Sequence, residues 1–251
     1  MLTERVAFEG PHGNIAGKLD LPDSMPRAYG VFAHCFTCSK DVLAANRIAQ
    51  GLAAHGVAML RFDFAGLGAS AGDFGDTNFS SNVEDLVAAA GFLREKFAAP
   101  RLLVGHSMGG TAVLAAAHRI PESRAVVTIA SPSDPHYVVN ALLSEHLDTL
   151  AELGQARVKL AGREFQIRQQ FVEDATRHRL AERISDLGRA LLVMHAPGDD
   201  TVDIANALRI FEMAQYPKSF VSLDGVDHLV TGREDAAQVA AMIAAWSGRY
   251  I

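Results

Sequence analysis

The sequence has little cysteine and no excess of positive charge. Its 251 residues include two cysteines, Cys35 and Cys38, which are too few for the disulfide framework of a small secreted domain. The net charge of -6 at pH 7 offers no basic field to nucleic acid or to anionic lipid. No stretch has the roughly 18 uninterrupted apolar residues of a membrane-spanning helix. We therefore expect no nucleic acid and no membrane among its partners, but a small molecule or a protein.

The start of the chain lacks the basic and apolar regions of a signal peptide, so we expect a cytoplasmic protein. Hydrophobic residues make up 49% of the sequence, which is ample for one core at this length. The expected organisation is one domain over residues 1–251. The sequence leaves open whether the protein forms a homodimer and whether the chain is a fragment of a longer protein.

The most informative motif is a serine between glycines. Gly105-His-Ser107-Met-Gly109 fits the pattern G-x-S-x-G and follows an apolar run, 102–104, that predicts a buried strand. An alanine-rich stretch then predicts a helix. A sharp turn between strand and helix lifts the serine hydroxyl above the sheet, and small neighbours let the chain turn without collision. The context indicates a nucleophile elbow with Ser107 as nucleophile; the alternative is a helix start at which the glycines only allow close packing.

Short apolar runs alternate with helical patterns along most of the chain. Two runs near the start flank a turn-rich segment and predict an antiparallel hairpin, 6–8 with 15–21. The later strands are expected at 29–33, 57–62, 102–104, 126–129, 191–194 and 220–223, and the helices at 42–55, 82–97, 108–119, 204–214 and 235–246. Such alternation predicts an α/β fold, with a mostly parallel sheet covered by helices on both faces.

One interval, 133–187, is too long for a simple connection between two strands. It contains helical patterns at 138–153 and 168–183 with a hairpin pattern at 157–167 between them. We expect this insertion to lie above the active edge of the sheet as a cap. Its apolar positions would form one stripe: Tyr137, Val138, Leu142, Leu143, Leu147, Leu150, Phe165, Ile167 and Phe171.

The role of that stripe is open at this point. Buried over the active edge, it would roof an apolar pocket suited to short acyl or aromatic esters. It would equally serve to pack the insertion onto the body or to form a dimer contact. The basic side chains of the insertion most simply form its solvated face, or gather near the pocket and attract an anionic substrate: Arg157, Lys159, Arg163, Arg168, Arg177, Arg179 and Arg183.

A serine hydroxyl needs a base, an acid that orients the base, and donors for the oxyanion that forms. Asp199 and Asp200 follow the expected strand 191–194, and His228 follows the strand 220–223. Both loops lie at the edge of the sheet where Ser107 is expected. The order Ser107, Asp199, His228 is the one expected for an α/β-hydrolase triad. Among ten histidines only His228 stands in the right loop.

The choice of acid rests on spacing. Asp199 stands four residues after His195 and three before Val202, which is the spacing of the H-G-x-x-D-x-x-V pattern of related hydrolases. Asp199 is therefore preferred, with Asp200 and the more remote Asp134 as alternatives. His106, inside the elbow, is expected to point away from the hydroxyl.

The oxyanion site should use two backbone N–H groups, one from Met108 and one from the loop after the strand 29–33. Phe36 in that loop is the expected second donor. The same loop contains Cys35-x-x-Cys38, which raises redox or metal chemistry as an alternative. A thioredoxin-like role would require this motif to open a helix in another fold, and a zinc site would require further ligands. We expect neither a metal nor a cofactor.

Together these residues resemble the α/β-hydrolase family over the whole chain. Three segments are similar, more narrowly, to the hydrolase half of bifunctional hydrolase/OsmC-type proteins: His34–Asp41, Arg61–Ser70 and Asp76–Asp85. Two positions depart from the broad family, because Cys35 replaces a glycine and Ala65 replaces an arginine. The resemblance implies an eight-stranded sheet, esterase chemistry without a cofactor, and an OsmC-type domain in longer relatives.

The leading hypothesis is a serine hydrolase of the carboxylesterase type, acting on a small-molecule ester through an acyl-enzyme. A thioesterase, a C–C hydrolase or a perhydrolase would use the same triad, and the fold alone does not separate them. A non-catalytic binding module on a hydrolase scaffold is a hypothesis of another class. It is disfavoured because such scaffolds usually lose a member of the triad, whereas this sequence offers all three.

Overall fold

Eight strands form one sheet in the order β1-β2-β4-β3-β5-β6-β9-β10 in the computed structural model, which describes residues 1–160 and 162–251. The pairs β1·β2 and β2·β4 are antiparallel and the other pairs are parallel, so the expected α/β class is confirmed. The strands are β1 (Leu2–Gly10), β2 (Gly13–Leu21), β3 (Ala28–Ala33), β4 (Val57–Phe62), β5 (Leu102–His106), β6 (Ala125–Ile129), β9 (Ala190–His195) and β10 (Lys218–Ser222).

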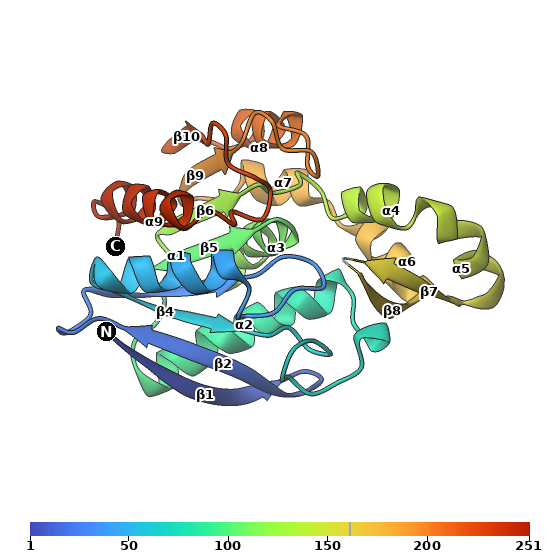
Figure 1. The fold of residues 1–251 in the computed structure, drawn as a ribbon, viewed down its shortest axis with the longest axis horizontal. Helices are drawn as coiled ribbons and strands as arrows, with labels where there is room; N and C mark the ends of the chain where they lie inside the picture. The colour runs from blue at the N-terminus through green and yellow to red at the C-terminus, as the bar shows by residue number, and fades with distance from the viewer. Residues whose placement is uncertain (161) are drawn as a thin grey trace.

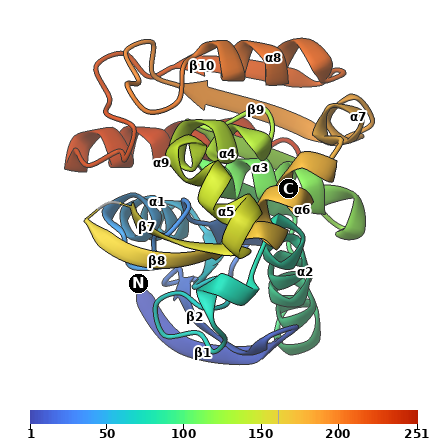
Figure 2. The ribbon, with the colours of Figure 1, turned by 90° about the vertical axis from the view of Figure 1, so that its right-hand side faces the viewer.

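Helices cover both faces of this sheet. One face carries α1 (Leu43–Ala54) and α9 (Arg233–Ser247), which pack against each other. The other face carries α2 (Phe79–Lys96), α3 (Met108–Ala116), α7 (Leu180–Ser185) and α8 (Ala205–Met213). Figure 2 views the sheet from one end, with α1 and α9 on one side and α2 and α7 on the other. The predicted helices of the body are confirmed, with ends that differ by a few residues.

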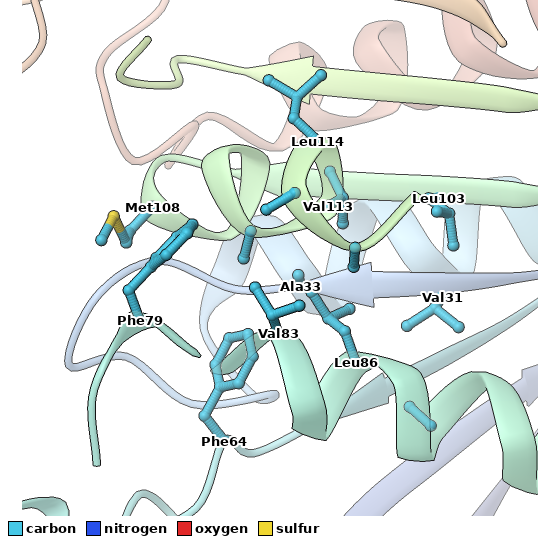
Figure 3. Close-up of a cluster of buried hydrophobic side chains, with 14 of the residues drawn as sticks. Val31, Ala33, Phe64, Phe79, Val83, Leu86, Leu103, Met108, Val113 and Leu114 are labelled. Atoms are coloured by element: carbon cyan, nitrogen blue, oxygen red, sulfur yellow. The ribbon is translucent and has the colours of Figure 1, made fainter. Parts of the chain in front are cut away.

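The central strands β3, β4, β5, β6 and β9 are largely apolar because each contributes side chains to two hydrophobic layers. In β4, Val57 and Met59 join the layer under α1 and α9, whereas Leu60 and Phe62 join the layer under α2 and α3. This alternation is the two-residue period of a strand that is buried on both faces. Figure 3 shows part of the second layer, in which side chains of β3, β5, α2 and α3 meet: Val31, Ala33, Leu103, Val83, Leu86 and Val113. Each buried Val or Leu side chain among them stabilises the fold by about 1.5–3 kcal/mol.

Between β6 and β9 the chain forms the inserted segment, which we define as residues 133–187. It contains α4 (His136–Leu142), α5 (Leu147–Leu153), β7 (Gln155–Leu160), β8 (Arg163–Arg168) and α6 (Gln169–Arg177) before α7. Most of it stands apart from the sheet, at the right in Figure 1. The expected hairpin is confirmed: β7 and β8 pair antiparallel from Gln155 opposite Arg168 to Leu160 opposite Arg163. Ala161, which belongs to the predicted hairpin, lies outside the described residues.

The prediction of two long continuous helices in this segment, 138–153 and 168–183, is wrong, because each is interrupted. The first breaks at the fully buried Leu143, and a short 3₁₀ turn (Ser144–His146) separates α4 from α5. The second breaks at His178, where the backbone is extended. The His178 ring packs edge-on against Phe79 at 4.6 Å and bonds the Ser80 hydroxyl at 2.9 Å. These contacts with α2 are tertiary, so local helical periodicity does not reveal them.

The apolar stripe of the inserted segment is mostly buried against the body. Val138, Leu143, Leu150, Phe165, Ile167 and Phe171 all join the layer that also contains Met108. Leu142 departs from the expectation, because 41% of its surface is exposed. Within the described ranges, no helix is long and apolar enough to cross a membrane.

Candidate active site

Ser107 occupies a sharp turn between β5 and α3. Its φ of 54° and ψ of -127° lie outside the regions that L-residues prefer. The Ser107 N–H donates to the carbonyl oxygen of Ile129 in β6 at 2.8 Å, which fixes the turn to the sheet. Glycine is required beside it: a Cβ on Gly105 would lie 2.2 Å from the Gly109 oxygen, and a Cβ on Gly109 would lie 2.3 Å from the Ala33 oxygen. The strand–turn–helix context expected of a nucleophile elbow is therefore present.

The structure brings the three predicted triad residues together. The Ser107 Oγ and His228 Nε2 atoms are 3.1 Å apart, although the residues are separated by 121 positions in sequence. On the other side of the ring, His228 Nδ1 lies 2.8 Å from Asp199 Oδ2 and 3.1 Å from Oδ1. A carboxylate only accepts, so Nδ1 carries the proton and Nε2 is free to accept from the serine hydroxyl. Ser107 and His228 are buried, and the Asp199 side chain is fully buried.

Asp199 is held in its ionised, accepting form. Burial raises the pKa of Asp199, but hydrogen bonds from His228 and from the backbone N–H groups of Val202 and Thr201 outweigh burial and hold the pKa below 3.8. Asp200 is exposed and accepts only from the Thr201 hydroxyl at 3.0 Å. Asp134 accepts from the N–H of His136 at 2.8 Å. Of the three acids considered, the structure places only Asp199 at the imidazole.

Two buried histidines support the loops of the acid and the base. His106 Nε2 donates to the backbone oxygen of His228, and His195 Nε2 donates to the backbone oxygen of Val202, each at 2.7 Å. Burial, and next the nearby His228, lower the pKa of His106 to about 4, so this ring is neutral near pH 7. The sequence placed His106 away from the hydroxyl but gave no sign of this bond. Only the fold shows that residues 106 and 228 are neighbours.

The loop of residues 34–39, which contains the predicted oxyanion donor Phe36 and is called the oxyanion loop below, follows β3 and faces the start of α3. Phe36 and Met108 line the same small pocket. The N-terminus of a helix, such as that of α3, favours negative charge. The loop contains a feature that the sequence did not predict, a disulfide between Cys35 and Cys38. Two cysteines at this spacing fit several chemistries, and their pairing depends on the turn that the fold imposes.

The oxyanion loop is anchored on both sides. Upstream, the buried His34 accepts from the Phe64 N–H at 3.4 Å through Nε2 and donates through Nδ1 to the Cys35 oxygen at 2.8 Å. Burial lowers the pKa of His34 to about 4, which keeps this ring neutral. Downstream, the buried Asp63 accepts from both the backbone N–H and the Nζ of Lys40, each at 2.6 Å. The segment Arg61–Ser70 therefore contacts the oxyanion loop through Phe64 and holds Lys40, just after the loop, through Asp63. The glycines of this segment lie in the turn that follows.

A cavity of about 410 Å³ opens beside Ser107's neighbour His106 and extends to the inserted segment. Its wall combines both sulfur-bearing residues of the oxyanion loop with apolar side chains: Cys35, Cys38, Val42, Leu43 and Leu229. Arg163 of β8 and Asp41 are the charged residues of the wall. Among the described residues, no three histidine, cysteine or acidic side chains gather as they would around a metal ion. The cavity is thus largely apolar, and its wall includes the chain neighbours of two predicted triad residues, His106 beside Ser107 and Leu229 beside His228.

Comparison with known proteins agrees with this architecture. A family model described as Hydrolase_4, serine aminopeptidase S33, matches residues 25–161. The esterase domain of a protein from Rhodothermus marinus is 45% identical, with a TM-score of 0.82 over 100% of this chain and 99% of that one. The chain therefore belongs to the Hydrolase_4 family of α/β-hydrolases.

More distant structures share the fold. Est1E from Butyrivibrio proteoclasticus, solved with ferulic acid bound, is 18% identical with a TM-score of 0.84 over 98% of both chains. XC6422 from Xanthomonas campestris, described as an α/β serine hydrolase without a lid, is 18% identical with a TM-score of 0.69 over 98% of this chain and 94% of that one. Among curated proteins, no sequence matches this chain.

Proposed function

We propose that this hydrolase is a serine esterase that cleaves small carboxylic esters, with Ser107, His228 and Asp199 as its catalytic triad. One observation carries the proposal: the buried imidazole of His228 lies within hydrogen-bond distance of the Ser107 hydroxyl on one side and of Asp199 on the other. This is the arrangement in which a serine acts as a nucleophile at neutral pH. The 45% identity to the Rhodothermus marinus esterase domain supports the choice of ester chemistry.

The proposed reaction has two steps. Ser107 Oγ attacks the ester carbonyl while its proton passes to His228 Nε2, and the same proton then goes to the departing alcohol. Water next attacks the acyl-enzyme and gives a proton to His228, which passes it to Ser107 Oγ as the acid leaves, so that Ser107 and His228 are regenerated. Asp199 holds the imidazole in the required tautomer and stabilises its charged form. The backbone N–H groups of Met108 and Phe36 are the proposed donors to the oxyanion in both steps.

The cavity beside the triad supports uncharged substrates. Most of its wall is apolar, so the ester would place an acyl or aromatic group against Val42, Leu43 and Leu229. The inserted segment supplies Arg163 to the wall and packs Phe171 against Phe36 with ring centroids 5.4 Å apart. We therefore propose that this segment acts as a cap and restricts the size of the acyl or alcohol group.

We also propose a closer kinship with the hydrolase half of hydrolase/OsmC-type proteins, supported by the segments His34–Asp41, Arg61–Ser70 and Asp76–Asp85. In longer relatives of that kind an OsmC-type domain would be the partner of this hydrolase.

The test is a panel of p-nitrophenyl and aryl esters of graded acyl length, run beside a thioester series, a vinylogous diketone and a peracid assay. We expect the highest kcat/KM on a carboxylic ester. In Ser107→Ala this kcat/KM should fall by at least about a thousandfold, because the triad acts as a unit. Higher kcat/KM on thioesters or diketones would assign the same triad to a thioesterase or a C–C hydrolase. Folded protein with no turnover of any of these would support a binding module instead.

A further inference from the structure

We propose that the Cys35–Cys38 disulfide positions the oxyanion loop, so that ester hydrolysis depends on this bond being oxidised. The inference rests on the esterase function proposed above and adds two positioning residues and a chemical dependence to it. Cys35 and Cys38 are the protein's only cysteines.

The disulfide closes the turn that carries the proposed donor. Phe36 and Thr37 lie between the two half-cystines, whose Cα atoms are 5.4 Å apart. The same turn is closed a second time by the Cys38 N–H, which donates to the Cys35 oxygen at 3.2 Å. The direction of the Phe36 N–H is thus set by a ring of four residues. A covalent bond across so short a ring leaves the donor little freedom to turn away from the reacting carbonyl.

The turn needs this restraint because one of its residues is in an unfavourable conformation. Thr37 has a φ of 61°, in the left-handed region that β-branched residues avoid. A chain with this residue would be expected to relax toward negative φ, which would reorient the Phe36–Thr37 peptide, the direct neighbour of the peptide that carries the Phe36 N–H. In the broad α/β-hydrolase family, we expect a glycine at the position of Cys35. A disulfide that restrains the turn is consistent with the replacement of that glycine by a cysteine.

Few other contacts hold the turn itself. The His34 ring donates to the Cys35 oxygen at 2.8 Å, at the start of the turn, and the anchor at Lys40 lies outside it. Within it, and among the described residues, the further hydrogen bond is a long one of 3.5 Å from Arg163 Nη1 to the Thr37 oxygen. The Phe36 ring packs against Phe74 and Phe171 at centroid distances of 5.6 and 5.4 Å. These ring contacts position a side chain, and they leave the peptide N–H free to rotate.

The bond is within reach of a reductant. Cys38 is half-buried and lies on the wall of the open cavity beside the triad, whereas Cys35 is buried. A dithiol can therefore attack from the cavity: its thiolate displaces one sulfur, and its second thiolate closes a disulfide within the reductant. Two electrons and two protons pass to the protein, which gains two thiols, and the reductant leaves as its own disulfide.

The experiment compares the oxidised protein with the same protein reduced by dithiothreitol. Because the chain has two cysteines, a thiol titration should count none before reduction and two after it. We expect kcat to fall by about tenfold to a hundredfold, less than the 10²–10³ that follows outright removal of an oxyanion donor. KM should change by less than about twofold. Reoxidation with a disulfide reagent should restore kcat.

A trifluoromethyl ketone inhibitor supplies a readout that general loss of structure would not mimic. It forms an oxyanion on Ser107, so its inhibition constant should rise by the same factor by which kcat/KM falls. The inhibition constant of the product carboxylate, which forms no tetrahedral adduct, should stay within about twofold. The Cys35→Ser/Cys38→Ser double variant should match the reduced wild type in kcat and should not respond to dithiothreitol, while keeping a native circular dichroism spectrum.

Several results would overturn the inference. Reduced protein with two titratable thiols and an unchanged kcat would show that the bond does not position the donor. A rise in KM with an unchanged kcat would show that the disulfide shapes the substrate-binding cavity and does not position the donor. If the double variant does not fold, the reversible reduction of the wild type decides alone. An oxidised protein that hydrolyses no ester would instead contradict the esterase function, and this inference would fall with it.

Discussion

His106 and His228 are joined by a hydrogen bond of 2.7 Å from the His106 ring to the His228 backbone oxygen. Their rings lie 5.3 Å apart, centroid to centroid. The residue beside the nucleophile thus holds the backbone of the base. Because burial lowers the pKa of His106 to about 4, the ring makes this contact as a neutral donor that does not repel a protonated His228.

Replacing His106 should therefore reduce turnover more than substrate binding. We expect His106→Ala to lower kcat by roughly threefold to tenfold, the equivalent of one lost buried hydrogen bond, with KM nearly unchanged. His106→Gln retains an N–H donor and should recover part of the loss. Steady-state kinetics of the three proteins measures this effect. A His106→Ala protein with a native fold and wild-type kcat would show that the contact has no part in positioning His228.

A second prediction concerns the acid. Asp199→Asn should lower kcat by about a thousandfold or more, because an amide no longer holds the imidazole in its useful tautomer. Asp200→Asn is the matched control: the side chain is exposed, adjacent and not bonded to His228, so its kcat should stay within about twofold. The ratio of the two kcat values is the measurement. The reverse ranking would transfer the role of the acid to Asp200.

A third prediction follows from buried titratable groups. His34 and His106 have pKa values of about 4 in the folded protein against 6.5 when exposed, so between these pH values the unfolded chain binds more protons. Their contribution to stability is therefore lost as pH falls from 6.5 toward 4. Asp85 acts in the opposite sense, because burial raises its pKa to about 6 and the folded protein keeps a proton that the unfolded chain releases.

Near pH 5.5 these effects leave a net uptake of about one proton on unfolding, or about 1.4 kcal/mol of stability lost per pH unit on acidification. Asp85→Asn removes the opposing group and should raise the uptake to about two protons. Urea unfolding at pH 5, 5.5 and 6 measures both slopes. Equal slopes in the two proteins would contradict the assignment of Asp85 as the group that offsets the histidines.

A fourth prediction concerns the cavity. Its apolar wall predicts that a neutral aryl ester has a higher kcat/KM than the same ester carrying a carboxylate, with little dependence on salt. The alternative is that Arg163 and other basic side chains of the inserted segment attract anions. A preference for the anionic ester that weakens as salt is added would indicate exposed positive charge and contradict the apolar site.

Local sequence pattern predicted the central strands of the sheet well because they are buried on both faces and stand out as apolar runs. It placed the end of β5 two residues too early, since Gly105 and His106 extend the strand only by pairing with Thr128 and Ile129 of β6. Motif spacing named Ser107, Asp199 and His228, which the fold brings together. It could not reveal the His106 bond to residue 228, the Cys35–Cys38 bond or the helix break at His178, because each depends on a contact made only in the folded chain.

The central claim is that Ser107 is a nucleophile activated by His228. Mass spectrometry after treatment with a fluorophosphonate tests it directly, because this reagent bonds to an activated serine whatever the natural substrate. We expect one label per chain, on Ser107, with no label in Ser107→Ala and labelling at least about a hundredfold slower in His228→Ala. Folded wild-type protein that stays unlabelled at Ser107, or that labels equally fast without His228, would contradict it.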